Sequence, residues 1–379
     1  MSQKDFSSAL LKSVVIFLSV LFFLLSIDLM GLSIGSLAGD SLADFIDITS
    51  NPFVGLFIGL MSTALLQSSS TTTSIAVAAV ASGAISLQGA IPIILGANIG
   101  TTITSTIVSM GYISKATEFR KAVAAGTVHD FFNIIMVLLL FPLEASYHIL
   151  ERCSLYITSF FNLENGVSAE PGFESIAFFD TINGWLVALL GPIPSLLLGI
   201  LILFLCIKLI SKWLYTILIG KTKDRFKDVV FKTKYRAFGW GLAITSLAQS
   251  SSLTTSLIVP LVATGKVKIK KAFHFILGAN IGTTITALLA ASFQSEAAIS
   301  LAIVHLLFNL IGVTIFLLIP FVSTLPVYLA KKLGELTFRL RVAGFVYILI
   351  AFFLIPFTLI YLSSSIEKEQ VALEMKSED

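Results

Sequence analysis

The chain has 379 residues, of which 56% are hydrophobic and 12% are charged, and its mean hydropathy is +0.95. This composition has more apolar surface than one soluble core can bury, so it predicts a polytopic membrane protein and excludes a soluble one. The net charge of +3 argues against nucleic-acid binding, and the two cysteines, Cys153 and Cys206, indicate neither a disulfide framework nor a zinc site.

Seven stretches are apolar and long enough to cross a bilayer, which takes about 20 residues of helix. The first extends to about Leu37 and contains Asp28, which favours an anchoring span over a cleaved signal peptide. Asp28 itself is left open between a structural and a functional role. In chain order, the predicted crossings are residues 14–36, 91–113, 120–142, 184–207, 272–293, 298–322 and 342–362.

Two further segments, Pro52 to Gly89 and Phe238 to Gly265, contain apolar stretches that are too short to cross. Pro52 to Leu66 is 15 residues, so as a helix it extends about 22 Å against about 30 Å of hydrocarbon. We therefore predict a re-entrant hairpin in each segment, with its polar turn at mid-membrane. The alternative is a pair of ordinary spans that place Ser and Thr at helix contacts.

The polar turns belong to a duplication. The run Gln67–Ser74 recurs as Gln249–Ser256, and the run Ile94–Thr104 recurs as Ile276–Thr286, each 182 residues further along the chain. Because both the sequence and the spacing are repeated, the two copies are expected to form two halves of one polar site inside the membrane.

Positive charge orients the crossings. With seven crossings, the lysines and arginines of the short loops fall on one side, which we take as cytoplasmic, and an acidic stretch lies outside. The first hairpin then opens outward and the second inward, because three crossings separate them. The expected organisation is a first repeat (1–143), an external loop (144–183), a crossing with a basic cytoplasmic loop (184–236), a second repeat (237–325), and a C-terminal crossing with a tail (326–379).

The expected site is built from neutral hydrogen-bonding groups. Serine and threonine hydroxyls, the Asn98 and Asn280 amides, and backbone N–H groups at broken helix ends can replace the water around a small oxyanion. The same hydroxyls and nearby carbonyl oxygens suit an alkali cation, and Gln67 and Gln249 can serve either ion. No Lys or Arg lies in either motif, so a co-bound cation would offset the charge of an anion.

A looser echo pairs His129–Asn133 with His305–Asn309, and in the second copy Asp130 has no acidic counterpart. A carboxylate within an apolar span is expensive, which indicates a cation ligand or a proton carrier. The alternative is a structural carboxylate that is satisfied by hydrogen bonds. His129 and His305 have no further ligands at metal spacing, so they are expected to bond to buried partners.

At these residues the chain resembles the type II sodium-dependent phosphate cotransporter family, as a bacterial member. The resemblance covers the paired Gln-Ser-Ser-Ser runs, the Gly-Ala-Asn-Ile-Gly-Thr-Thr after each, and the segments Glu118–Ala122 and Val128–Asn133. It implies a phosphate site that contains Ser68, Ser69, Ser70, Ser251 and Ser252, beside the donors Gln67, Asn98 and Asn280. It also implies a sodium site at Ser250, Thr283 and Thr286, with Gln249 and Ser246 close by, and a further cation site at Asp130 and Asn133, where Asp130 matches an acid of the electrogenic members.

The chain departs from the animal members of that family in its external stretch. This stretch is short, has no Asn-x-Ser/Thr sequon and holds one cysteine, and the chain ends soon after Tyr361. The expected location is therefore a bacterial inner membrane, with the N-terminus in the cytoplasm and the C-terminus outside.

The expected function is electrogenic import of inorganic phosphate, coupled to co-transported sodium ions and driven by alternating access. The alternative within this class is a sodium-coupled carrier of sulfate or a carboxylate. An intramembrane enzyme that uses His129 and Asp130 is disfavoured, because no nucleophile, metal set or second acid accompanies them. A passive anion channel would differ by showing no dependence on the sodium gradient.

Overall fold

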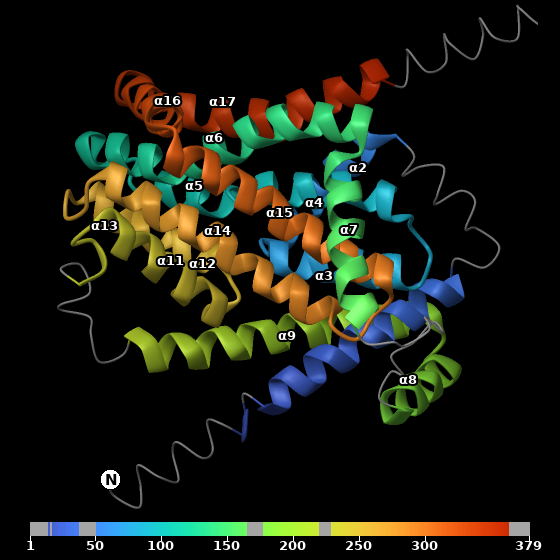
Figure 1. Cartoon of the computed structure of the whole chain (residues 1–379). Helices are drawn as coiled ribbons and strands as arrows, with labels where there is room; N and C mark the ends of the chain where they lie inside the picture. Colours follow the sequence, from blue (N-terminus) through green and yellow to red (C-terminus); the bar gives the residue numbers. More distant parts are fainter. Residues whose placement is uncertain (1–13, 16, 38–50, 165–176, 220–228, 364–379) are drawn as a thin grey trace, which may run out of the picture.

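The structure is a computed structural model that describes residues 14–15, 17–37, 51–164, 177–219 and 229–363 (Figure 1). These residues form helices and no strands, which confirms the predicted all-α fold. The N-terminal residues, the middle of the expected external loop, part of the basic loop and the C-terminal tail lie outside the described residues. The labelled helices are α2 (Pro52–Leu66), α3 (Ser69–Ala81), α4 (Leu87–Gly100), α5 (Ile103–Met110), α6 (Ala116–Tyr147), α7 (Ile149–Glu164), α8 (Ala177–Leu190), α9 (Pro192–Ile219), α11 (Lys234–Ala248), α12 (Ser251–Ser256), α13 (Ile258–Ala263), α14 (Ile269–Ala291), α15 (Glu296–Leu318), α16 (Pro320–Arg339) and α17 (Ala343–Leu349), which continues as a π-helix at Ile350–Leu354.

Seven helical stretches of the described chain are long and apolar enough to cross a membrane, as the sequence predicted. Three helical stretches that border the two Gln-Ser-Ser-Ser runs, Pro52–Leu66, Ser69–Ala81 and Ser251–Ala263, are apolar but shorter than these spans. The two re-entrant hairpins stay a prediction. The seven stretches are Phe17–Leu37, Leu87–Met110, Ala116–Tyr147, Pro192–Leu209, Ile269–Ala291, Glu296–Leu318 and Ala343–Ser363.

The fourth predicted crossing, residues 184–207, is wrong in its bounds. The chain breaks at Gly191, whose φ of +83° is a left-handed conformation that glycine adopts without strain. Pro192 then starts α9, because a proline lacks the N–H that the first turn of a helix leaves unpaired. The crossing is therefore Pro192–Leu209, and the residues before Gly191 form the separate helix α8.

Helix α7 lies in the stretch that the sequence predicted only as an external loop. It follows His148, whose φ is +51°, and the N–H of Leu150 in its first turn donates to the Glu144 carboxylate at 2.5 Å. The helix packs on α15, where the hydroxyls of Thr158 and Ser300 are 2.9 Å apart. In Figure 1, α7 extends from the side of the molecule with α17 toward the side with α9.

Helix α16 was also not predicted as an element of its own. It starts at Pro320, after the end of α15, and packs along α6. The Arg120 guanidinium of α6 lies over the Phe338 ring at 5.6 Å from the ring centroid. This contact and Arg339 in the last turn fix a basic end of the molecule between α6 and α16.

The two halves of the duplication pack in the same way. Helix α2 lies against α4 in the first half, and α11 lies against α14 in the second. A Cβ added at Gly96 of α4 would meet the Leu56 carbonyl oxygen at 1.8 Å, and a Cβ at Gly278 of α14 would meet that of Phe238 at 2.0 Å. Both residues of the second contact follow those of the first by 182 positions, so the close backbone approach is itself repeated.

The halves differ where the second motif of each ends. Helix α4 stops at Gly100 and α5 starts at Ile103, whereas α14 runs on without a break. In the first half, the hydroxyls of Thr101 and Thr102 both donate back to carbonyls of their own helix, at 2.8 and 2.7 Å. In the second half, the equivalent Thr283 instead accepts a hydrogen bond from another helix. Thr284, the equivalent of Thr102, still donates back to Ile281 at 2.7 Å in the unbroken helix, so the two halves differ at Thr101 and Thr283.

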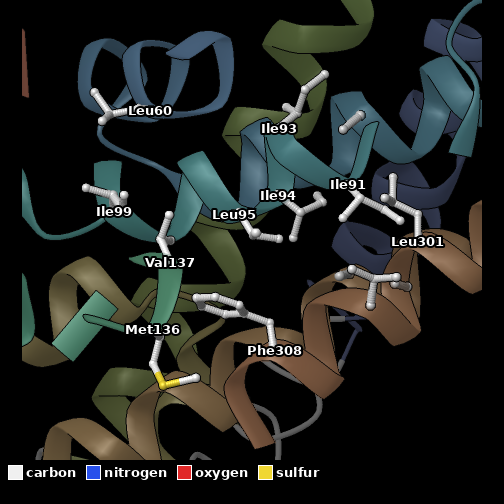
Figure 2. Packing of buried hydrophobic residues seen from close by; sticks show 14 of the residues in the cluster. Leu60, Ile91, Ile93, Ile94, Leu95, Ile99, Met136, Val137, Leu301 and Phe308 are labelled. Atoms are coloured by element: carbon white, nitrogen blue, oxygen red, sulfur yellow. The ribbon is translucent and has the colours of Figure 1, made fainter. Parts of the chain in front are cut away.

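A continuous apolar core joins the halves. Figure 2 shows Ile94 of α4 between Leu60 of α2, Met136 of α6, and the pair Leu301 and Phe308 of α15. All five side chains are buried. Because α4 contacts α2, α6 and α15, the duplicated motif of the first half is packed against a helix of the second half.

Candidate functional site

The two Gln-Ser-Ser-Ser runs have the same local structure. Gln67 follows α2 with a φ of +52°, and Gln249 follows α11 with a φ of +50°. The next residue in each run, Ser68 or Ser250, caps the following helix, because its hydroxyl accepts a backbone N–H of the first turn. Each run therefore turns the chain between two short helices and presents the next two serines at a helix start.

The two runs meet each other. The Ser70 hydroxyl donates to the carbonyl oxygen of Gln249 at 2.8 Å, although 179 residues separate them. The equivalent hydroxyl of Ser252 donates to the Thr101 carbonyl at the α4–α5 break, at 3.4 Å. Each of these two serines, which the sequence assigned to phosphate, thus contacts the backbone of the opposite half. Both hydroxyl protons are engaged with carbonyls, so an anion would have to take them over.

The other predicted phosphate residues of the runs are placed less evenly. Ser69 and Ser251 are buried, and the Ser251 hydroxyl lies 3.4 Å from the hydroxyl of Thr283. Ser68 is half-buried and Gln67 is exposed. The glutamine of the first turn, Gln67, is therefore exposed, whereas that of the second turn, Gln249, is buried.

Gln249 is one of several residues of the second half that carry a buried side-chain oxygen without a hydrogen-bonding partner. Its side-chain Oε1 has no hydrogen-bonding partner, and neither do the hydroxyls of Thr245 and Thr286. Buried oxygens without a hydrogen-bonding partner are of the hard type that an alkali cation prefers. Of the other predicted sodium ligands, Ser246 and Ser250 are half-buried, and the Ser250 hydroxyl also caps α12.

Thr245 was missed from the sequence. It precedes Ser246 and lies outside the Gln-Ser-Ser-Ser run, but it follows Thr63 by 182 residues. Thr63 and Thr104 of the first half carry buried hydroxyls without partners, as do their equivalents Thr245 and Thr286. Extending the repeat a few residues before each run would have identified both.

Asp130 is fully buried in α6, with 0% of its surface exposed. Its Oδ2 accepts hydrogen bonds from the Thr106 hydroxyl at 2.9 Å and from the Tyr347 hydroxyl at 3.0 Å. Its Oδ1 has no hydrogen-bonding partner. The carboxylate therefore has one buried oxygen that no hydrogen bond satisfies. Tyr347, which belongs to the C-terminal span, was missed because no motif marks it.

The predicted residues Asn98 and Asn133 take part in one network of amides. Asn133 donates to the Asn98 backbone carbonyl at 2.6 Å, and Asn309 of the second half donates to the Asn98 side-chain oxygen at 3.2 Å. The Asn98 amide nitrogen donates to Ile94 of its own helix at 2.9 Å. The structure therefore shows Asn98 as a link between α4, α6 and α15, while the Oδ1 of Asn133 is left without a partner.

Asn280 forms the second link between the halves. Its Oδ1 lies 2.5 Å from Nε2 of His129, so two residues that the sequence singled out are joined across α14 and α6. Its amide nitrogen is buried without a partner and remains available as a donor. His129 thus bonds to a buried partner, as expected.

Asp28 lies apart from these groups. Its Oδ2 accepts a hydrogen bond from the Asn183 amide of α8 at 2.9 Å, and the same amide approaches the Leu25 carbonyl at 3.2 Å. This pair ties the N-terminal span to α8, which supports the structural reading of Asp28.

These features define a multi-span helical membrane protein with a duplicated polar centre. The sequence pattern of the Na+/Pi-cotransporter family matches residues 22–161 and 201–364, and the chain belongs to this family. It is 31% identical over 440 residues to the human "Sodium-dependent phosphate transport protein 2B", and 33% identical over 398 residues to the rat "Sodium-dependent phosphate transport protein 2A".

These alignments cover 90% and 85% of the chain, but the chain spans only 64% and 62% of the length of the two relatives. No solved structure matches the chain.

Proposed function

We propose that the chain is a secondary active symporter that imports inorganic phosphate together with sodium ions. One observation carries the proposal: the duplicated serine turns of the two halves touch, through Ser70 and the Gln249 carbonyl at 2.8 Å, and the side chain of the same Gln249 has a buried oxygen without a partner. Hydroxyl donors suit an oxyanion, and unsatisfied oxygens suit a cation. The names of the relatives support phosphate and sodium as the two ions.

Phosphate would take over hydroxyl protons that now bond to carbonyls. Ser70 and Ser252 then turn from carbonyl oxygens to phosphate oxygens, and the freed carbonyls of Gln249 and Thr101 become available to cations. Anion and cation binding would therefore favour each other. We assign the anion to Gln67, Ser68, Ser69, Ser70, Asn98, Ser251, Ser252 and Asn280, and sodium to Thr245, Ser246, Gln249, Ser250, Thr283, Thr286, Asp130 and Asn133.

Opposite orientation of the halves supports alternating access. The residue before α2, Asn51, donates to Ser363 at the end of the C-terminal span, at 3.0 Å. The corresponding residue before α11 is Thr233. Two residues before it, the Phe231 carbonyl accepts a hydrogen bond from Lys271, at the basic start of α14, at 2.7 Å. Helix α2 thus starts at the end of the C-terminal span that is remote from the basic end at α16, whereas α11 starts beside Lys271. An inverted repeat of this kind lets one site open to either side in turn.

The same charge distribution gives the orientation that we propose. The basic ends lie in the cytoplasm, and with seven spans the N-terminus is inside and the C-terminus outside. The short external stretch without a sequon supports the inner membrane of a bacterium. Transport is proposed to be electrogenic because Asp130 offers a further cation ligand, and each net charge moved gains about 2.3 kcal/mol per 100 mV.

Uptake of radiolabelled phosphate into proteoliposomes tests this function. An inward sodium gradient should drive accumulation above the external concentration, and an equal potassium gradient should not. An excess of unlabelled phosphate should reduce the labelled uptake more strongly than the same excess of sulfate or of a small carboxylate. Stronger competition by sulfate or a carboxylate would assign the carrier to that anion, and equal uptake without sodium would contradict symport.

A further inference from the structure

The C-terminal span reaches the buried acid of α6 through one tyrosine. Tyr347 lies in α17, and its hydroxyl donates to Oδ2 of Asp130 at 3.0 Å. Its ring lies against that of Phe131, the next residue of α6, with 5.8 Å between centroids, and against Phe352 at 6.4 Å. The ring is thus held between two others, which fixes the hydroxyl toward the carboxylate.

The two oxygens of the Asp130 carboxylate are used unequally. Thr106 donates to the same Oδ2 at 2.9 Å, and Oδ1 has no partner. Thr102 also approaches this carboxylate, but its hydroxyl donates to the Ile99 carbonyl at 2.7 Å. Two donors on one oxygen fix the plane of the carboxylate and leave the other oxygen as a free ligand. Tyr347 therefore acts on the orientation of Asp130 and does not fill its free position.

This arrangement belongs to the first half alone. The residue 182 positions after Thr106 is Leu288, and the counterpart of Asp130 in the looser echo is Leu306. Tyr347 lies after both repeats, in a span with only 11% of its most apolar stretch buried in the protein, against 72% for α6. A π-helix follows at Ile350–Leu354, and such local widening is frequent at functional sites.

We propose that Tyr347 is a positioning residue that holds Asp130 in the geometry that binds its cation. The proposal rests on the proposed sodium-coupled transport and goes further, because it makes the affinity of one cation depend on the packing of the C-terminal span against α6. A cation that binds Asp130 Oδ1 stabilises the hydrogen bond from Tyr347, and loss of that hydrogen bond lowers the affinity for the cation.

Tyr347→Phe tests the proposal, because it removes the hydroxyl and keeps the ring. The sodium concentration for half-maximal phosphate uptake should rise roughly 10-fold, as expected for one hydrogen bond to a charged group. The maximal rate at saturating sodium should not change. Thr106→Val, which removes the other donor, should act in the same direction. Tyr328→Phe on α16, an exposed tyrosine with its ring beside Lys332, is the matched control and should behave as wild type.

A second readout does not depend on transport. Sodium should raise the Tm of the purified protein, and Tyr347→Phe should shift the midpoint of that rise to higher sodium by a similar factor. In an Asp130→Asn background, Tyr347→Phe should have no further effect on the midpoint. A lower maximal rate with an unchanged sodium midpoint would show a merely structural role and would overturn the proposal. So would an equal shift in the Asp130→Asn background. Sodium-independent uptake by wild type would contradict the proposed function, while the Tm series would still decide the role of Tyr347.

Discussion

The two halves of the molecule share their backbone and differ in their ligands. In both halves, a glutamine with positive φ and a serine that caps the next helix lie between two short helices. In both halves, a glycine also lets the helix of the second duplicated run lie in close backbone contact with its neighbour. Yet Gln249 is 6% exposed with a free oxygen, whereas Gln67 is exposed. The first half instead carries Asp130, where the second has Leu306. The duplication thus builds one meeting point, and its divergence gives each half a different buried oxygen without a partner, Asp130 Oδ1 in the first half and Gln249 Oε1 in the second.

The largest effect is expected where the halves are most alike. Gly96→Ala and Gly278→Ala each place a Cβ within 2.0 Å of a carbonyl oxygen, so helix packing must open. We expect each substitution to lower the free energy of unfolding by about 3 kcal/mol or more, at the upper end for overpacked cores. The two variants should lower the Tm in detergent by similar amounts. Gly239→Ala, which meets no atom within 4 Å, is the control. A clear difference in Tm between Gly96→Ala and Gly278→Ala would show that the halves are not packed alike.

The serine turns should also respond alike. Ser70→Ala and Ser252→Ala each remove a hydroxyl that bridges the halves, at a cost of about 1–3 kcal/mol for a buried hydrogen bond. Phosphate uptake should fall by roughly 5-fold to 100-fold. Ser82→Ala serves as the control, since this hydroxyl donates within α3 to Ala79. Wild-type uptake by both variants, at wild-type expression, would remove these serines from the site.

A smaller effect is expected at the acid that only the first half has. Asp130→Asn removes one fixed charge, so one sodium ion per cycle should no longer bind. Uptake should continue and still need sodium, but lose its stimulation by an inside-negative potential, which is worth at most about 2.3 kcal/mol per charge per 100 mV. Potassium and valinomycin set the potential. Glu118→Gln, an acid paired with Lys115 at 3.4 Å near the start of α6, is the control. An unchanged voltage response would assign Asp130 a structural role.

The smallest effect separates the two glutamines. Gln249→Ala removes a buried oxygen proposed to bind sodium, and the sodium concentration for half-maximal uptake should rise roughly 10-fold, the value of one such ligand contact of about 1.4 kcal/mol. Gln67→Ala, at the exposed equivalent that we assign to the anion, should change this sodium concentration less than 3-fold, because an exposed side chain of the anion site contributes only about 0.5 kcal/mol to cation binding. Equal effects would mean that both turns bind the cation in the same way.

Periodicity and repetition were enough to predict the spans and the meeting of the serine turns. An uninterrupted apolar run shows length and not direction, so the break at Gly191 and Pro192 was read as part of a crossing, although the Gly-Pro pair signals a turn. Helices α7 and α16 lie outside the seven spans, so their packing on α15 and α6 was not visible in hydropathy.

The site was predictable only where it is repeated. The serines and Gln249 carry a duplicated motif, and Thr245 was within reach of the same 182-residue comparison. Tyr347 was not, because its hydrogen bond to Asp130 spans 217 residues and has no equivalent in the other half. Long-range contacts of this kind depend on how the last span packs, which local sequence does not encode.

The inverted relation of the halves is tested most directly by the positions that precede them. Asn51 and Thr233, which cap α2 and α11, are 182 residues apart. Single cysteines at these two positions, in a protein without Cys153 and Cys206, should be labelled by an impermeant thiol reagent from opposite faces of the membrane, Asn51→Cys from outside and Thr233→Cys from the cytoplasm. Labelling of both from one face would contradict the inverted repeat and, with it, a single site that opens to each side in turn.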